Sequence, residues 1–262
     1  MKSDTPTGLA VIPPAPDSGL GIASCARELV EAAVSTFAPA HHPDDLPRGG
    51  GQTVLLIPGF LAGDWTMLRL KDFLTHLDYR VEFAGVAVNL GPTKGLIPQL
   101  EQTVERLFAG AGRPIILIGQ SLGGVFARGL AHRHPDKISH VVTLCSPIRF
   151  PIPTPLEAFA KLLAPLHDPS ALDLESEIVR APLVPVTALY SKSDGIVDWR
   201  SCLQDESEHC VNLEVAAAHS AMGSHPQAQV AIAHALARVS ATRGSQPGPA
   251  EPSRPDDAGR GR

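Results

Sequence analysis

The spacing of hydrophobic positions along the chain changes near residue 53. Residues 21–38 place apolar side chains three and four positions apart, from Ile22 to Phe37, which predicts an amphipathic helix. From residue 53 onward, short unbroken aliphatic runs alternate with helical patterns. Unbroken runs are typical of strands buried on both faces, so their alternation with helices predicts an α/β fold with a parallel sheet covered on both sides.

We count six such strands and five helices in this part of the chain. The strands are expected over 53–60, 80–89, 114–119, 138–146, 184–191 and 211–218. The helices are expected over 64–77, 95–112, 122–134, 198–206 and 226–239.

The composition of the chain changes at both ends. Residues 1–20, rich in Pro, Ser, Thr and Asp, and residues 241–262 have too little apolar sequence for a core, which predicts disordered tails. We therefore expect an added helix and linker over 21–45 and one main domain over 46–240. Within that domain, a Pro-rich insertion over 147–184 interrupts the alternation.

Composition and charge exclude several classes of protein. The chain has 262 residues, a hydrophobic fraction of 44% and a formal net charge of -5, and its basic residues form no stripe. A nucleic-acid partner is therefore not expected. No apolar stretch approaches the roughly 20 residues that span a bilayer, and the N-terminus lacks the apolar core of a signal peptide. We expect a soluble, cytoplasmic protein without an integral membrane segment, and the oligomeric state stays open.

The four cysteines are too few and too scattered for a disulfide framework. Cys202 and Cys210 could form a bridge, but unpaired thiols are the favoured reading. The sequence contains no CxxC or His-rich spacing, so neither a zinc site nor any other metal or cofactor is expected.

A serine between glycines follows the third predicted strand. Gly119-Gln120-Ser121-Leu122-Gly123 fits the G-x-S-x-G nucleophile elbow, a sharp turn from strand to helix. Such a turn holds the serine in a strained conformation and crowds the positions two before and two after it. Both positions must then be very small, and here both are glycine. Ser121 is therefore a candidate nucleophile.

A serine needs a base and the base needs an orienting acid, which follow in the order Ser, Asp or Glu, His in chains with this elbow. Asp194 comes directly after the fifth predicted strand, and Asp198 competes with it four residues later. We favour Asp194 because the position of Asp198 is typical of the N-cap of a helix that starts at Trp199. His219 follows the last predicted strand and is the candidate base.

Acyl transfer places negative charge on a carbonyl oxygen, which preorganised N–H donors stabilise. One candidate donor is the backbone of Leu122, which follows the serine. The other should come from the loop after the first strand, where Phe60 is preferred and Leu61 is the alternative.

These segments together resemble the α/β-hydrolase superfamily over about residues 52–240. The resemblance rests on "LLIPGFLAGDW", "GQSLGG", "SKSDGIVD" and "AHSAMGSHP", which stand in the family's order. It implies Ser121, Asp194 and His219 as a catalytic triad and Phe60 and Leu122 as the oxyanion hole. It also implies the reduced, six-stranded sheet of small lipases, since no leading antiparallel strands precede residue 53.

A serine at the elbow sets this chain apart from relatives with aspartate or cysteine there. We expect a serine hydrolase that cleaves carboxylic esters of small-molecule or lipid-like substrates, in the manner of an esterase or lipase. An acyltransferase with the same triad and a non-catalytic binding protein are the alternatives. The insertion is the expected lid, whose apolar face either contacts substrate or packs on the core. The expected substrate-binding residues are Leu61, Leu156, Phe159 and Leu163.

Overall fold

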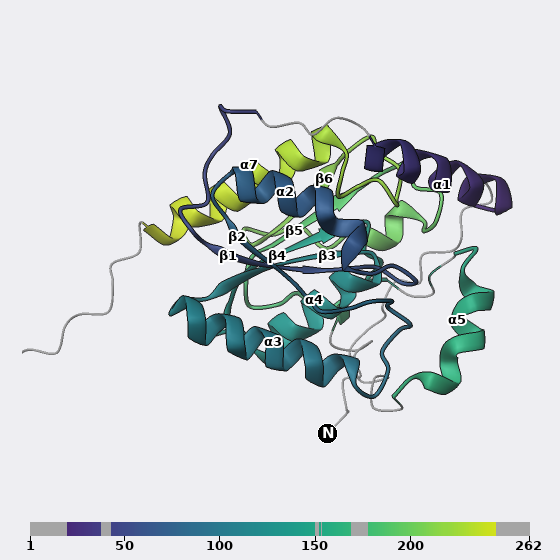
Figure 1. Cartoon of the computed structure of the whole chain (residues 1–262), viewed down its shortest axis with the longest axis horizontal. Coiled ribbons are helices and arrows are strands. Elements are labelled where there is room, and N and C mark those ends of the chain that lie inside the picture. Colours follow the sequence, from purple (N-terminus) through teal and green to yellow (C-terminus); the bar gives the residue numbers. More distant parts are fainter. Residues whose placement is uncertain (1–19, 38–42, 150–151, 153, 169–177, 245–262) are drawn as a thin grey trace, which may run out of the picture.

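The computed structural model describes residues 20–244, except 38–42, 150–151, 153 and 169–177 (Figure 1). Nearly all of the two expected tails lies outside these residues. The sheet has six strands in the order β2-β1-β3-β4-β5-β6, and every neighbouring pair is parallel. The strands are β1 (Thr53–Ile57), β2 (Arg80–Phe83), β3 (Ile115–Gln120), β4 (Ile138–Leu144), β5 (Val186–Tyr190) and β6 (Cys210–Glu214). The predicted α/β fold with a six-stranded parallel sheet is confirmed.

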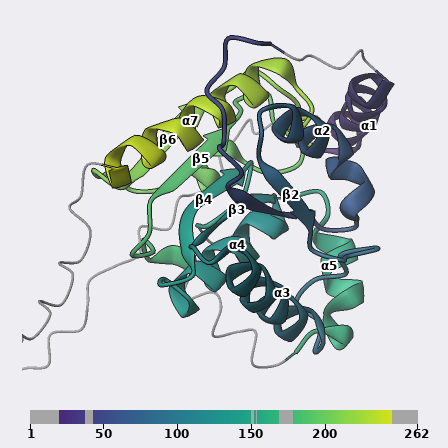
Figure 2. The same cartoon turned by 60° about the vertical axis from the view of Figure 1, so that its left-hand side comes forward.

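Helices cover both faces of the sheet. In the described residues the helices are α1 (Ile22–Phe37), α2 (Leu68–His76), α3 (Leu96–Ala111), α4 (Leu122–Arg133), α5 (Glu157–Leu163) and α7 (Pro226–Gly244). Short 3-10 turns are η1 (Asp64–Met67), η2 (Ala164–Leu166) and η4 (Trp199–Cys202). Helices α2 and α7 lie on one side of the sheet, and α3 and α4 lie on the other (Figure 1 and Figure 2).

Strand β1 shows why its sequence is aliphatic at every position. Val54 and Leu56 pack in the core layer under α2 and α7, whereas Leu55 and Ile57 pack in the layer under α3 and α4. Successive side chains of a strand point to opposite faces, so a strand covered on both sides needs apolar residues throughout. The two layers share this central sheet.

Several predicted boundaries were wrong. Strand β2 ends at Phe83 rather than at residue 89, and Gly85 has a φ of 75°, a turn conformation that a strand does not adopt. Strand β6 ends at Glu214, so residues 215–218 form a loop. The helix expected over 198–206 is the single turn η4, and α7 runs on to Gly244, into residues expected to be tail.

All four cysteines are free, as the favoured reading of the sequence predicted. No helix in the described part of the chain has the length and apolar character needed to span a bilayer.

Candidate active site

Parallel strands direct their carboxyl ends to one edge of the sheet, where the loops that follow them meet. Ser121 follows β3, Asp194 lies in the loop after β5, and His219 lies in the loop after β6. The fold therefore brings these three segments to the same edge, although they are far apart in the sequence.

Ser121 lies in the turn between β3 and α4. Its φ of 51° and ψ of -122° are strained for a residue with a side chain. Its N–H donates to the carbonyl of Leu144 on the neighbouring strand, at 2.8 Å. A Cβ atom at Gly119 would collide with the backbone of Gly123, and one at Gly123 would collide with the carbonyl of Ile57. The turn therefore requires glycine at both positions that the sequence singled out.

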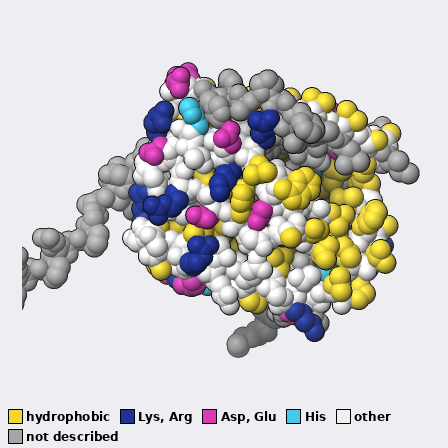
Figure 3. Space-filling model, viewed as in Figure 1, with side chains coloured by type: hydrophobic (Ala, Val, Ile, Leu, Met, Phe, Trp, Pro, Cys, Tyr) yellow, Lys and Arg dark blue, Asp and Glu magenta, His cyan; other side chains and the backbone are white. Residues whose placement is uncertain are grey.

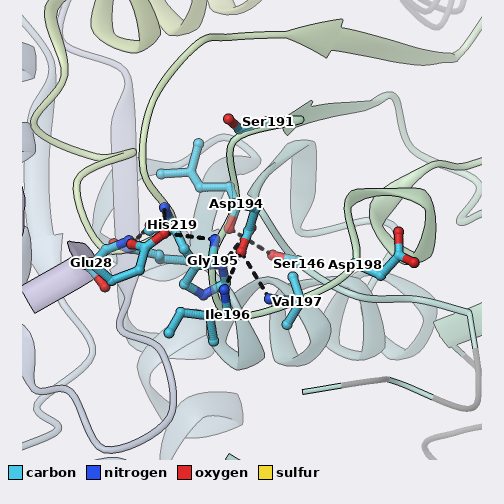
Figure 4. Close-up of polar contacts among 12 residues, drawn as sticks. Glu28, Ser146, Ser191, Asp194, Gly195, Ile196, Val197, Asp198 and His219 are labelled. Atoms are coloured by element: carbon cyan, nitrogen blue, oxygen red, sulfur yellow. Dashed lines mark hydrogen bonds and ion pairs between the residues drawn. The ribbon is translucent and has the colours of Figure 1, made fainter. Parts of the chain in front are cut away.

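Asp194 and His219 form a buried pair. The Nδ1 atom of His219 lies 2.7 Å from Oδ2 of Asp194, and the two residues are 5% and 8% exposed. The other oxygen of Asp194 accepts from the backbone N–H groups of Ile196 and Val197, both at 2.8 Å (Figure 4). Because the carboxylate accepts from Nδ1, the neutral ring carries its proton there and leaves Nε2 as a proton acceptor.

Asp198 has different partners. Its side chain accepts from the backbone N–H of Arg200 at 3.0 Å and so caps η4. The guanidinium of Arg200 also donates to both of its oxygens, at 2.9 and 2.7 Å. Burial alone would raise the pKa of Asp198, but these contacts with Arg200 lower it below its ordinary value. Figure 4 shows its carboxylate turned away from His219, so the structure brings Asp194, and not Asp198, to the histidine.

The surroundings of His219 favour its charged form. Burial penalises the imidazolium and acts to lower the pKa of His219. The Asp194 carboxylate, its hydrogen bond and the carboxylate of Glu28 act in the opposite direction and prevail. The pKa of His219 is therefore raised above its ordinary value of 6.5.

Cys145 brings a third donor atom to this pair. One ligand atom each from Cys145, Asp194 and His219 lies within 4.8 Å of the others, and all three residues are buried. Burial and the nearby Asp194 carboxylate raise the pKa of the Cys145 thiol well above its ordinary value, whereas a metal needs the thiolate. Both oxygens of Asp194 already accept hydrogen bonds. The group fits an Asp–His pair beside a neutral thiol better than a metal site.

The loop after β1 is held in place by Asn89, a buried residue that the sequence analysis did not single out. The side chain of Asn89 donates to the carbonyl of Pro58 at 2.9 Å, and the backbone carbonyl of Asn89 accepts from Leu61 N–H at 2.8 Å. The N–H of Leu61 is therefore engaged. Phe60, by contrast, lines the same pocket as Ser121 and is the better candidate donor of this loop.

A pocket of about 290 Å³ opens beside Ser121. Most of its lining is apolar, with Thr154 and His167 as polar exceptions besides the serine. Leu122 and Phe126 line it from α4, and Leu156 and Ala160 line it from the insertion. Apolar walls with few polar groups are typical of sites for small, largely apolar ligands.

The structure brings one of the four expected substrate-binding residues to this pocket. Leu156 lines it, whereas Leu61, Phe159 and Leu163 are not among its lining residues. Phe159 is 53% exposed and Leu162 is 73% exposed, so much of the apolar face of α5 points to solvent. Figure 3 shows hydrophobic side chains gathered on the side where α5 lies in Figure 1.

Comparison with known proteins agrees with this architecture. A family model described as the alpha/beta hydrolase fold matches residues 109–174, which include the elbow. The structure resembles lipase B of Aspergillus fumigatus, with a TM-score of 0.59 and 16% identity over 75% of this chain and 55% of that one. It also resembles the monoacylglycerol lipase of Paleococcus ferrophilus, with a TM-score of 0.54 and 15% identity over 74% of this chain and 97% of that one. The chain has the α/β-hydrolase fold.

A third similar structure is a soluble variant of monoglyceride lipase from Saccharomyces cerevisiae in complex with a substrate analog. Its TM-score is 0.54, with 15% identity over 74% of this chain and 90% of that one. No match was found among curated proteins. The expected resemblance to the α/β-hydrolase superfamily is confirmed at the level of the fold.

Two further polar residues of this α/β-hydrolase fold support the loop of His219. The side chain of Gln120 donates to the carbonyl of His219 at 2.9 Å. The carboxylate of Glu28, from α1, accepts from the backbone N–H of His219 at 3.0 Å. Gln120 lies inside the elbow motif, which could have drawn attention to it. Glu28 gives no such signal, because a glutamate in a helix is ordinarily exposed.

Proposed function

We propose that this protein is a serine hydrolase that cleaves carboxylic esters through an acyl-enzyme. The observation that carries the proposal is the 2.7 Å hydrogen bond between Asp194 and His219, at the sheet edge that also presents the strained Ser121. In the proposed triad Ser121 is the nucleophile, His219 is the general base and Asp194 orients the imidazole.

The first half of the reaction forms the acyl-enzyme. Oγ of Ser121 attacks the ester carbonyl while its proton passes to Nε2 of His219. The backbone N–H groups of Phe60 and Leu122 are the proposed donors to the oxyanion. The bond from the carbonyl carbon to the alkoxy oxygen then breaks, and the imidazolium gives its proton to the leaving alcohol.

The second half releases the acid. Water attacks the acyl carbon, His219 takes one of its protons, and the proton returns to Ser121 as the serine ester breaks. The Asp194 carboxylate stabilises the imidazolium that forms in both halves, in line with the raised pKa of His219. The apolar pocket beside Ser121, bordered by Leu156 and Ala160, supports an acyl chain as the recognised part of the substrate.

Hydrolysis of p-nitrophenyl esters from acetate to palmitate tests the proposal. We expect wild-type turnover, and we expect Ser121→Ala to lower kcat/KM by about 10⁴-fold or more. A fluorophosphonate probe should label the wild type on the peptide that contains Ser121 and should leave Ser121→Ala unlabelled. Equal, slow hydrolysis by both proteins would contradict the nucleophile. Product esters formed in the presence of added alcohol would instead indicate acyl transfer.

A further inference from the structure

Helix α1 precedes the sheet in the sequence, yet its residue Glu28 lies among the loops of the candidate site. The side chain is almost fully buried, with 1% exposure. One carboxylate oxygen accepts from the backbone N–H of Gly195 at 2.8 Å and of His219 at 3.0 Å. The other oxygen accepts from the N–H of Ser220 at 2.9 Å, and Figure 4 shows Glu28 beside Gly195 and His219. Glu28 thus joins the loop of Asp194 to the loop of His219.

The rest of α1 holds Glu28 in this place. The hydroxyl of Ser24 donates to the carbonyl of Gly195 at 2.8 Å, and Arg27 donates to the carbonyl of Ser193 at 2.7 Å. Cys25 packs against the small apolar cluster that contains Ile196 and Val197. The helix is therefore fixed to the loop that carries Asp194 by several contacts, and Glu28 extends from it to the second loop.

We propose that Glu28 is a positioning residue, whose carboxylate ties the loop of Asp194 to the loop of His219 and thereby holds the Asp194–His219 hydrogen bond in its reactive geometry. This inference rests on the proposed hydrolase function. It gives α1, which lies outside the expected main domain, a role in the site.

The contacts explain why a carboxylate is needed here. Three N–H donors converge on two oxygens, and a carboxylate has acceptor sites on both. An amide would keep one oxygen but would turn an NH₂ group toward a donor. A buried charge is costly unless hydrogen bonds compensate it, and within the described part of the chain Glu28 forms no ion pair with Lys or Arg. Its three hydrogen bonds therefore supply the compensation.

The charge of Glu28 also acts on His219. The ionisable groups close to the ring are Asp194 and Cys145, with Glu28 against the backbone of the same loop. The Cys145 thiol is held neutral, so the two carboxylates are the charges that favour the imidazolium. Removing the Glu28 charge should lower the pKa of His219, because one of the groups that raises it is lost.

Glu28→Gln tests the proposal, with Glu31→Gln as the matched control. Glu31 lies one turn further along α1, has a side chain that is 45% exposed and pairs with Arg27 at 3.6 Å. We expect Glu28→Gln to lower kcat by about tenfold to a hundredfold, as misplaced catalytic groups do, with a smaller change in KM. The acidic limb of its pH–rate profile should move to lower pH. Glu31→Gln should retain both the wild-type rate and the wild-type limb.

The proposal is overturned if Glu28→Gln keeps the wild-type kcat and the wild-type acidic limb. It is also overturned if the rate falls only in proportion to the loss of folded protein while the limb stays in place, since a purely structural role would do that. Should Glu28→Gln not fold, Glu28→Asp decides. Aspartate keeps the charge but is one methylene shorter, so we expect a lower kcat and shifted amide resonances of His219 and Ser220. Wild-type kcat in Glu28→Asp would contradict the positioning role.

Titration of the His219 ring by NMR separates this inference from the proposed function. The ring signals, assigned by comparison with His219→Gln, report its pKa whether or not the protein hydrolyses esters. If the wild type has no esterase activity, the proposed function fails, and the titration still shows whether Glu28→Gln lowers the pKa of His219. If the wild type is active and the ring titrates identically in both proteins, only the role of Glu28 fails.

Discussion

Asp194 and Asp198 lie in the same loop and are both buried, yet their carboxylates serve different partners. Asp194 accepts from His219 and from two backbone N–H groups, whereas Asp198 caps η4 and binds Arg200. An aspartate that already caps a turn and binds a guanidinium has little capacity left for an imidazole. The partners, rather than burial, separate the two residues.

Asparagine substitutions at these two positions should therefore have unequal effects. Asp194→Asn keeps the size of the side chain but removes the charge and favours the wrong imidazole tautomer, so we expect kcat/KM to fall by about 10⁴-fold. Asp198→Asn retains a capping oxygen but loses one of the two oxygens that accept from Arg200, so it should leave kcat/KM near the wild-type value and lower the unfolding free energy by about 1 to 3 kcal/mol. Steady-state kinetics and urea denaturation measure both. A larger kinetic loss in Asp198→Asn would reverse the assignment.

The sequence allowed the three candidate triad residues to be proposed, from the elbow motif and from their order along the chain. It did not reveal the residues that hold them in place. Ser121 follows from glycine spacing, and Asp194 and His219 follow from their positions after strands. Glu28 and Asn89 act through hydrogen bonds to backbone atoms of distant segments, such as the one from Asn89 to Pro58. Such bonds impose no local pattern, so only the folded chain reveals them.

The geometry of the turn between β3 and α4 depends on glycine, which has no side chain, at positions 119 and 123. Gly119 packs directly against the backbone of Gly123 and Gly124, and backbone atoms cannot move aside as a flexible side chain can. The two glycines allow the end of β3 and the start of α4 to approach each other more closely than residues with side chains would. The strained conformation of Ser121 is a consequence of this close approach.

Alanine substitutions at two glycines should show the difference. Gly119→Ala places a methyl group within the backbone of the helix start, and we expect the free energy of unfolding to fall by about 3 kcal/mol or more. Gly110→Ala, in α3, meets no atom within 4 Å and should stabilise the protein by up to about 1 kcal/mol. Chemical denaturation measures both changes. Similar stability of the two variants would contradict the close-packed turn.

A helix or strand was predictable from the sequence where burial in the core was the one explanation for its apolar residues. The strands buried on both faces have continuous aliphatic sequences. Their alternation with helices allowed the number of strands and their parallel direction to be predicted. The role of the apolar face of α5 was ambiguous, because a pattern of leucines does not indicate whether the core, a ligand or solvent lies against it. In the structure, Leu162 of this face points to solvent. The end of β2 was missed because Val86 and Val88, beyond Phe83, continue the apolar pattern without belonging to the strand.

For the whole molecule, the raised pKa of His219 links stability to pH. The folded protein binds the proton of this ring more tightly than an exposed histidine does, whose pKa is 6.5. The resulting stabilisation is complete below about pH 6.5 and is lost as the pH rises through the folded-state pKa, because the folded state then gives up its advantage in proton binding.

The comparison of wild type with His219→Gln measures this link. We expect the difference in unfolding free energy between the two proteins to be largest at low pH and to shrink as the pH rises above about 6.5. Urea denaturation from about pH 5 to about pH 9 gives the curve. A difference that grows with pH would mean that burial outweighs the two carboxylates and that the pKa of His219 is lowered in the folded state.

The hydrogen bonds of Glu28 join residues 167, 191 and 192 positions apart. Helix α1 leaves the ribosome before any strand of the sheet, but the three N–H groups that donate to the Glu28 carboxylate emerge only after most of the sheet has been made. Helix α1 therefore cannot form these contacts until nearly the whole of the described chain has been synthesised. Helix α1 is thus made before the sheet but is among the last elements to dock, and until it docks the loops of Asp194 and His219 lack the link through Glu28.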